Sequence, residues 1–133
     1  MGIYDDLFTL RGQGSLLAKL KPLEPAKLQK LVDRYPNLPS DYISFLTTIG
    51  FGEIGQAQYM IYSGLGESEF VFGEPMPPQL EKVILLGDDF QGFNAGFQTD
   101  SWEVVEIDPI DRRVDVVAPD FQTFIRRAIS DLM

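Results

Sequence analysis

The chain has 133 residues, 44% of them hydrophobic, and a formal net charge of −9, which is typical of one globular domain with a substantial core. It contains no cysteine and no histidine, which excludes disulfides, zinc fingers, iron–sulfur clusters, cysteine nucleophiles and Ser-His-Asp triads. We therefore expect a single domain over residues 1–133, in which any catalysis would use carboxylate, Lys, Tyr, Ser or Thr side chains.

The negative charge is concentrated in the middle of the chain. Residues 51–111 carry twelve carboxylates and one cation, Lys82, whereas the segments on either side each carry one more cation than carboxylate. A field of this sign repels nucleic-acid phosphates and anionic lipids, and it steers cationic partners towards the protein. We therefore expect neither a nucleic-acid partner nor a membrane partner.

The amino-terminal residues have neither the basic start nor the apolar run of a secretory signal, and Asp6 stands where a myristoylation motif needs Ser or Thr. The strongest apolar run, residues 83–86, is much shorter than the roughly 20 residues that span a bilayer. These features predict a cytoplasmic protein.

Apolar residues recur at helical spacing through the first 50 residues. We expect a short helix around residues 16–20, a second helix over residues 25–35 and a third over residues 39–49. Pro25 suits the first turn of the second helix, because proline lacks the backbone N–H that this position does not need. Gly50 suits the left-handed conformation that ends many helices.

From residue 51 onward, short runs rich in aromatic and branched side chains alternate with turn residues, which predicts strands. The run 83–86 is apolar on both faces and should be central, whereas residues 93–98 alternate as a strand with one buried face. The expected strands are residues 57–62, 70–72, 82–86, 93–98, 102–107 and 113–117.

Residues 108–111, Asp-Pro-Ile-Asp, predict a reverse turn that joins the last two strands as a hairpin. Adjacent Val104 and Val105 break the alternation, which indicates a bulge or burial on both faces. Asp120 suits the amino-terminal cap of a last helix. Its inward face should be Phe121, Phe124, Ile125, Ala128 and Leu132. The predicted fold class is α+β: an antiparallel, mainly meander sheet of about six strands, preceded by helices and closed by a carboxyl-terminal helix.

Few side-chain patterns indicate chemistry. The glycine-containing loop 63–68 lacks the lysine and the spacing of a phosphate loop. The acids that follow residue 87 fail the calcium-loop spacing, so a solvated acidic face is the better interpretation. We expect no metal, no cofactor and no catalytic residue. Trp102 is more typical of a core anchor than of an interface.

Three segments resemble a known family. The run 38–46, Leu-Pro-Ser-Asp-Tyr-Ile-Ser-Phe-Leu, which closes at residues 50–52, Gly-Phe-Gly, resembles the opening motif of the SUKH superfamily of bacterial toxin-immunity proteins and a fungal cell-wall regulator. Residues 86–88 with the strand at 93–97 are similar to the central segment of that family, and the Phe121 helix to its closing helix. The resemblance implies an α+β fold, no catalysis and a protein partner, in bacteria often a secreted nuclease or deaminase toxin.

The first hypothesis is a non-enzymatic protein that neutralises a basic cognate toxin through an acidic surface, as a monomer or weak homodimer. Asp88, beside Gly87, could alternatively cap a turn. A second hypothesis is a regulatory or scaffold domain without a toxin. A third is a carboxylate-dependent hydrolase, which requires a deep pocket with two carboxyls about 5 to 9 Å apart. The candidate partner-binding residues are Glu53, Asp88, Asp89, Asp100, Glu103 and Glu106.

Overall fold

The computed structural model describes residues 4–12, 15–67 and 78–132. They form an α+β fold whose six strands lie in chain order, each antiparallel to the next, so the predicted meander sheet and closing helix are confirmed. The elements are η1 (Asp5–Arg11), α1 (Pro25–Arg34), α2 (Ser40–Thr48), β1 (Gly52–Ile54), β2 (Tyr59–Glu67), η2 (Pro78–Leu80), β3 (Val83–Asp88), β4 (Asn94–Gln98), β5 (Val104–Ile107), β6 (Val114–Ala118) and α4 (Phe121–Leu132).

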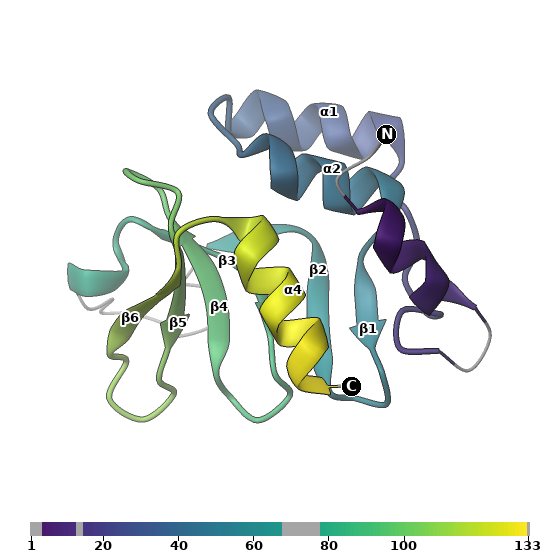
Figure 1. Cartoon of the computed structure of the whole chain (residues 1–133). Helices are drawn as coiled ribbons and strands as arrows, with labels where there is room; N and C mark the ends of the chain where they lie inside the picture. The colour runs from purple at the N-terminus through teal and green to yellow at the C-terminus, as the bar shows by residue number, and fades with distance from the viewer. Residues whose placement is uncertain (1–3, 13–14, 68–77, 133) are drawn as a thin grey trace.

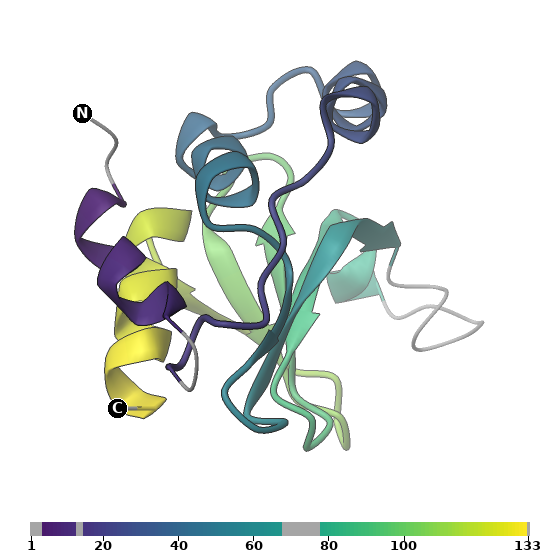
Figure 2. The same cartoon turned by 90° about the vertical axis from the view of Figure 1, so that its right-hand side faces the viewer.

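The helices cover one face of the sheet. Figures 1 and 2 show α4 lying across that face with η1 beside it, while α1 and α2 lie at the upper end. The core between α2, α4 and the sheet is a cluster of aromatic rings packed edge to face. The ring centroid of Tyr42 lies 5.1 Å from that of Phe97 and 5.0 Å from that of Phe121, and all three side chains are fully buried. Such pairs stabilise a core beyond the area that they bury.

The opposite face of the sheet carries a second, smaller cluster. Val105 belongs to this cluster and Val104 to the helix-side core, and the pairing with β6 shifts register between the two residues. Both alternatives predicted for this valine pair are therefore present. The central position of β3 is also confirmed, since its residues 83–86 are buried on both faces. The second cluster contains Leu80, Val83, Leu85, Val105 and Ile107.

Three local predictions are wrong. Residues 63–67 of the predicted glycine-containing loop continue strand β2. Residues 16–19 form turns instead of a helix, and the helical segment lies earlier, in η1. Nearby backbone groups pair with distant segments: Lys21 and Phe51 exchange two hydrogen bonds of 3.0 Å. The strand at residues 93–98 is buried on both faces, because Asn94 and Gly96 are covered, while Phe93 is 37% exposed and precedes β4. The three-residue β1 was not predicted, and the predicted strand 70–72 lies outside the described residues.

Gly50 takes the positive φ that the sequence predicts, 120°. The surroundings add a second reason for glycine, because a Cβ at this position would overlap the backbone of Lys21. Gly50 thereby lets the segment before α1 pass against the end of α2.

The amino terminus of α4 is held by two carboxylates. Asp120 accepts a hydrogen bond from the Thr123 backbone N–H at 2.7 Å, as predicted for a cap, and hydrogen bonding to Thr123 lowers the pKa of Asp120. Asp41 on α2 accepts a second one from the Gln122 N–H at 2.9 Å. A carboxylate at a helix amino terminus also interacts favourably with the helix dipole. Asp41 thus joins α2 to α4 across 81 residues of sequence.

Candidate functional site

Three turns lie along the lower end of the sheet in Figure 1: residues 55–58, 89–93 and 108–113. We call this set of turns, together with Asp88 at the end of β3, the lower edge. Gly92 and Pro109 bring two of the turns together, because a Cβ on Gly92 would lie 3.2 Å from the Pro109 ring. The turn at residues 108–111 is confirmed, with Asp108 accepting a hydrogen bond from the Ile110 N–H at 2.8 Å.

The six candidate acids do not form one cluster. Asp88 and Asp89 lie at the lower edge, whereas Asp100 and Glu103 lie at the opposite end of the sheet, in the turn between β4 and β5. Glu53 on β1 forms an ion pair with Lys19, and this partner lowers the pKa of Glu53. The sixth acid, Glu106, lies on β5 two residues after Val104 and so faces the helices.

Asp88 organises the end of β3. One of its carboxylate oxygens accepts a hydrogen bond from the Tyr62 hydroxyl at 2.6 Å, and the other accepts one from the Phe90 N–H at 2.9 Å. Asn94, which is 96% buried, donates in turn to the Tyr62 hydroxyl at 3.0 Å. Burial and the bond to Asp88 raise the pKa of Tyr62. Asp88 therefore has the turn-capping role that its neighbour Gly87 allows.

Asp89 builds the next part of the same turn. A single carboxylate oxygen accepts hydrogen bonds from the backbone N–H groups of Gln91 and Phe93, at 2.8 and 3.1 Å. Directly after these two acids, Phe90 is held at φ 63°, a left-handed conformation that is uncommon for a bulky residue. The acid pair thus fixes an aromatic residue in a strained position.

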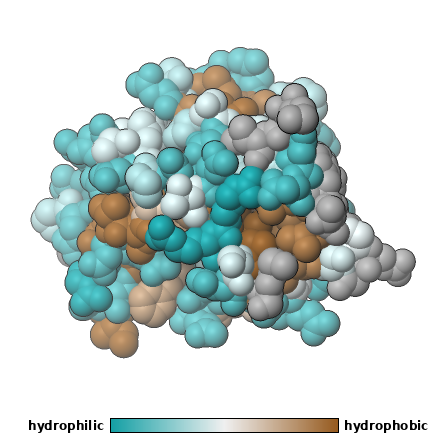
Figure 3. All heavy atoms as spheres, in the orientation of Figure 1, coloured by the Kyte–Doolittle hydropathy of each residue, from teal (hydrophilic) through white to brown (hydrophobic). Residues whose placement is uncertain are grey.

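The lower edge also exposes apolar side chains. Phe90 is 44% exposed, Phe93 37% and Ile110 88%, and they are three of the four exposed large hydrophobic residues in the described part of the chain. In Figure 3, hydrophobic atoms project at the lower left, where the β5–β6 turn lies. Asp88, Asp89, Asp108 and Asp111 lie on the same two turns, so this surface combines apolar groups with negative charge.

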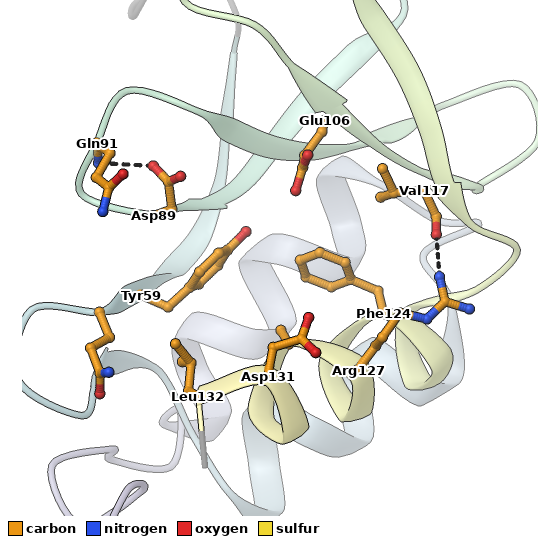
Figure 4. A pocket seen from close by; sticks show the side chains of 11 residues that line it. Tyr59, Asp89, Gln91, Glu106, Val117, Phe124, Arg127, Asp131 and Leu132 are labelled. Atoms are coloured by element: carbon orange, nitrogen blue, oxygen red, sulfur yellow. Dashed lines mark hydrogen bonds between the residues drawn. The ribbon is translucent and has the colours of Figure 1, made fainter.

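A cavity of about 330 Å³ lies above the lower edge, between the carboxyl-terminal half of α4 and the sheet. Figure 4 shows its lining side chains converging from β2, the β3–β4 turn, β5, β6 and α4. Phe124, Val117 and Leu132 supply apolar walls. The lining residues are Gln58, Tyr59, Asp89, Gln91, Glu106, Val117, Phe124, Arg127, Ala128, Asp131 and Leu132.

Tyr59 is 92% buried, and its hydroxyl points into the cavity between Asp89 and Glu106. Burial, followed by the charges of Glu106 and Asp89, raises the pKa of Tyr59. Burial raises the pKa of Glu106 as well, and so do the charges of Asp89 and Asp115. Desolvation disfavours the charged form of an acid, and like charges act in the same direction.

Arg127 supplies the positive charge of the cavity lining, but its side chain points away from Tyr59. The guanidinium of Arg127 donates a hydrogen bond of 2.7 Å to the Val117 carbonyl, and Figure 4 shows it pointing towards β6 and away from Tyr59. The space beside Tyr59 and Glu106 is therefore bordered by negative groups.

The comparisons with known proteins add no relative. No family model, curated protein or solved structure matches this chain. The SUKH resemblance therefore stays a prediction from its motifs. Over residues 4–12, 15–67 and 78–132, no group of three or more carboxylates is arranged to hold a metal ion, and no helix is long and apolar enough to cross a membrane.

Sequence reasoning identified Asp89 and Glu106 but missed Tyr59, Arg127 and Asp131. Tyr59 has the ordinary signature of a strand residue, and the two α4 residues that of a solvated helix face. They become neighbours only because α4 crosses the sheet at β2 and β5. Trp102, in contrast, follows its predicted role: it is half-buried and packs edge-on against Phe97 at 5.6 Å.

Proposed function

We propose that this protein is a non-enzymatic binding domain that engages a basic protein partner through the lower edge. The observation that supports this most strongly is the combination of three exposed apolar side chains with four carboxylates on two adjacent turns. Aromatic anchors surrounded by polar groups are typical of binding hot spots. Negative charge around them speeds the encounter with a cationic partner and selects its orientation.

The conformation of Phe90 is a second argument. An aromatic residue at positive φ costs free energy, and here two capping acids maintain it while the ring stays half exposed. Strain that supports an exposed ring favours a binding role for that ring.

The SUKH resemblance suggests one form of this proposal, an immunity protein whose partner is a nuclease or deaminase toxin. Nucleases carry basic grooves for phosphate, which an acidic inhibitor can occupy. The alternative form is a regulatory or scaffold domain without a toxin. A toxin gene next to the gene of this protein would favour immunity, and a neighbourhood without one would favour the scaffold.

The test is the affinity of the neighbouring toxin domain for matched variants. Ile110→Ala, at the lower edge, should weaken binding roughly tenfold, whereas Val116→Ala, an exposed valine on β6, should leave it unchanged. Asp131→Lys, beside the lower edge, should lower the affinity more than Asp100→Lys at the opposite end of the sheet. It should also reduce the salt dependence of binding more. Equal effects within both pairs would refute the lower edge as the interface.

The hydrolase is a second candidate, because Asp89, Glu106 and Asp131 share one cavity and paired carboxylates cleave glycosides. Turnover of chromogenic glycosides that disappears in Glu106→Gln would favour it. Toxin binding without such turnover would favour the binding domain.

A further inference from the structure

The cavity under α4 contains two polar groups that lack a protein partner. Neither the Tyr59 hydroxyl nor the Glu106 carboxylate takes part in a hydrogen bond with any described residue. Tyr59 is 92% buried as a residue, but its hydroxyl oxygen is not fully enclosed and faces a cavity that water can enter. Both groups face the same space (Figure 4). Both groups are therefore available to a ligand that can donate hydrogen bonds.

The charge of the lining decides the sign of that ligand. Three carboxylates, those of Asp89, Glu106 and Asp131, line the cavity together with one guanidinium, which is bonded to the Val117 carbonyl. An anion would meet repulsion from all three carboxylates. A cation with N–H donors could instead bond to Glu106 and to the oxygen of Tyr59 at once.

The shape and walls of the cavity indicate the rest of the ligand. Its volume of about 330 Å³ lies at the small end of ligand pockets. Phe124 and Leu132 on α4 and Val117 on β6 line the approach to Glu106. These apolar surfaces match a chain of methylene groups that ends in a charged head.

We infer that this cavity binds a primary alkylammonium group, with the Glu106 carboxylate and the Tyr59 hydroxyl as hydrogen-bond acceptors and with Phe124 and Leu132 against the methylene stem. A free diamine and a lysine side chain of a protein partner carry the same chemistry. The inference holds whether or not the lower edge binds a toxin, and a partner's lysine would extend that interface upward into the cavity.

The experiment is a calorimetric titration of the full chain with three probes. Nα-acetyl-lysine N-methylamide and 1,4-diaminobutane carry the ammonium, and Nα-acetyl-norleucine N-methylamide has the same stem without the charge. We expect the two amines to bind and the norleucine compound not to bind. Tighter binding of the lysine compound would identify a protein side chain as the natural source of the ammonium group. Tighter binding of the diamine would identify a free amine as that source.

Two variants and one control connect binding to this cavity. Glu106→Gln should weaken amine binding at least roughly tenfold, because it removes the charge of the acceptor, and Tyr59→Phe should weaken it roughly threefold. Glu103→Gln, a partly buried glutamate just before the same strand, should not change it. Absence of amine binding, equal binding of the norleucine compound, or equal losses in Glu106→Gln and Glu103→Gln would overturn the inference. Amine binding without any effect of Ile110→Ala on the toxin would retain the inference and refute only the proposed interface.

Discussion

The two halves of α4 meet the same sheet face in different ways. In the first half, Phe121 and Ile125 are fully buried in the aromatic core with Tyr42 and Phe97. In the second half, Asp131 and its neighbours lie over a cavity that contains Tyr59 and Glu106. Phe124, 6% exposed, lies at the boundary and packs against both Phe121 and Tyr59, at 6.2 and 6.1 Å between ring centroids.

Within this one helix, the first half serves stability and the second half serves binding. The first half is closed by apolar rings, as expected of a region that holds the fold together. The second half keeps the carboxylates of Asp89 and Glu106 close to the Tyr59 hydroxyl, and like charges close together are unfavourable for folding alone. Residues that violate packing rules in this way are typical of functional sites. Truncation of an apolar side chain should therefore cost much more stability in the first half than in the second.

The largest effect should follow truncation in the closed half. Phe121→Ala removes a fully buried ring that contacts Tyr42, Phe45 and Phe97, so the free energy of unfolding should fall by about 3–5 kcal/mol. Leu132→Ala, on the half-buried last turn, should cost less than about 1.5 kcal/mol. Urea denaturation measures both values. Similar losses for the two variants would contradict the division of the helix.

Asp41 tests how the closed half is anchored. Asp41→Ala removes the carboxylate that accepts hydrogen bonds from the Tyr42 and Gln122 N–H groups, and we expect a loss of about 1–2 kcal/mol in urea denaturation. Asp33→Ala, an exposed acid on α1 whose side chain bonds only to Gln29 among the described residues, is the matched control and should change stability by less than about 0.5 kcal/mol. If Asp33→Ala lowers the free energy of unfolding as much as Asp41→Ala, the Asp41 carboxylate does not anchor α4.

The two tyrosines offer a direct contrast between the halves. The Tyr42 hydroxyl is buried in the core without a hydrogen-bond partner among the described residues, so Tyr42→Phe should stabilise the protein by about 1 kcal/mol. Tyr59→Phe should change stability by less than about 0.5 kcal/mol, because the hydroxyl faces a cavity that water can enter. Thermal unfolding of both variants checks the pair. Destabilisation of the core variant would reveal a partner for that hydroxyl.

Glu106 should give the smallest effect and one that depends on pH. Burial and neighbouring charges raise its pKa, so the ionised form destabilises the folded state, and Glu106→Gln should stabilise the protein at pH 7 by roughly 0.5 kcal/mol after solvent screening. The gain should vanish as pH falls below the ordinary glutamate value of 4.5, where the carboxyl is neutral in both states. The free energies of unfolding of both proteins between pH 4 and 8 measure this stabilisation. A stabilisation that grows as the pH falls would contradict a raised pKa of Glu106 in the folded state.

Much of the closed half could be predicted from sequence, and little of the cavity. The helix at Phe121 and the central run 83–86 follow from periodicity, which is a local property of the chain. The placement of Tyr59 beside Glu106 depends on the pairing of β2, β3, β4 and β5 and on the crossing of α4, none of which has a local signature. The segment before α1 was mispredicted for the same reason, since its backbone pairs with Phe51.

The most direct test of the account is a map of amide chemical shifts during titration with Nα-acetyl-lysine N-methylamide. If the amine binds in the cavity, changes should be confined to residues 58–59, 89–91, 106 and 127–132, with none at Tyr42 or Phe97. Changes spread over the acidic surface, including Asp100 and Glu103, would show unspecific attraction of a cation and contradict the assignment of the site to the second half of α4.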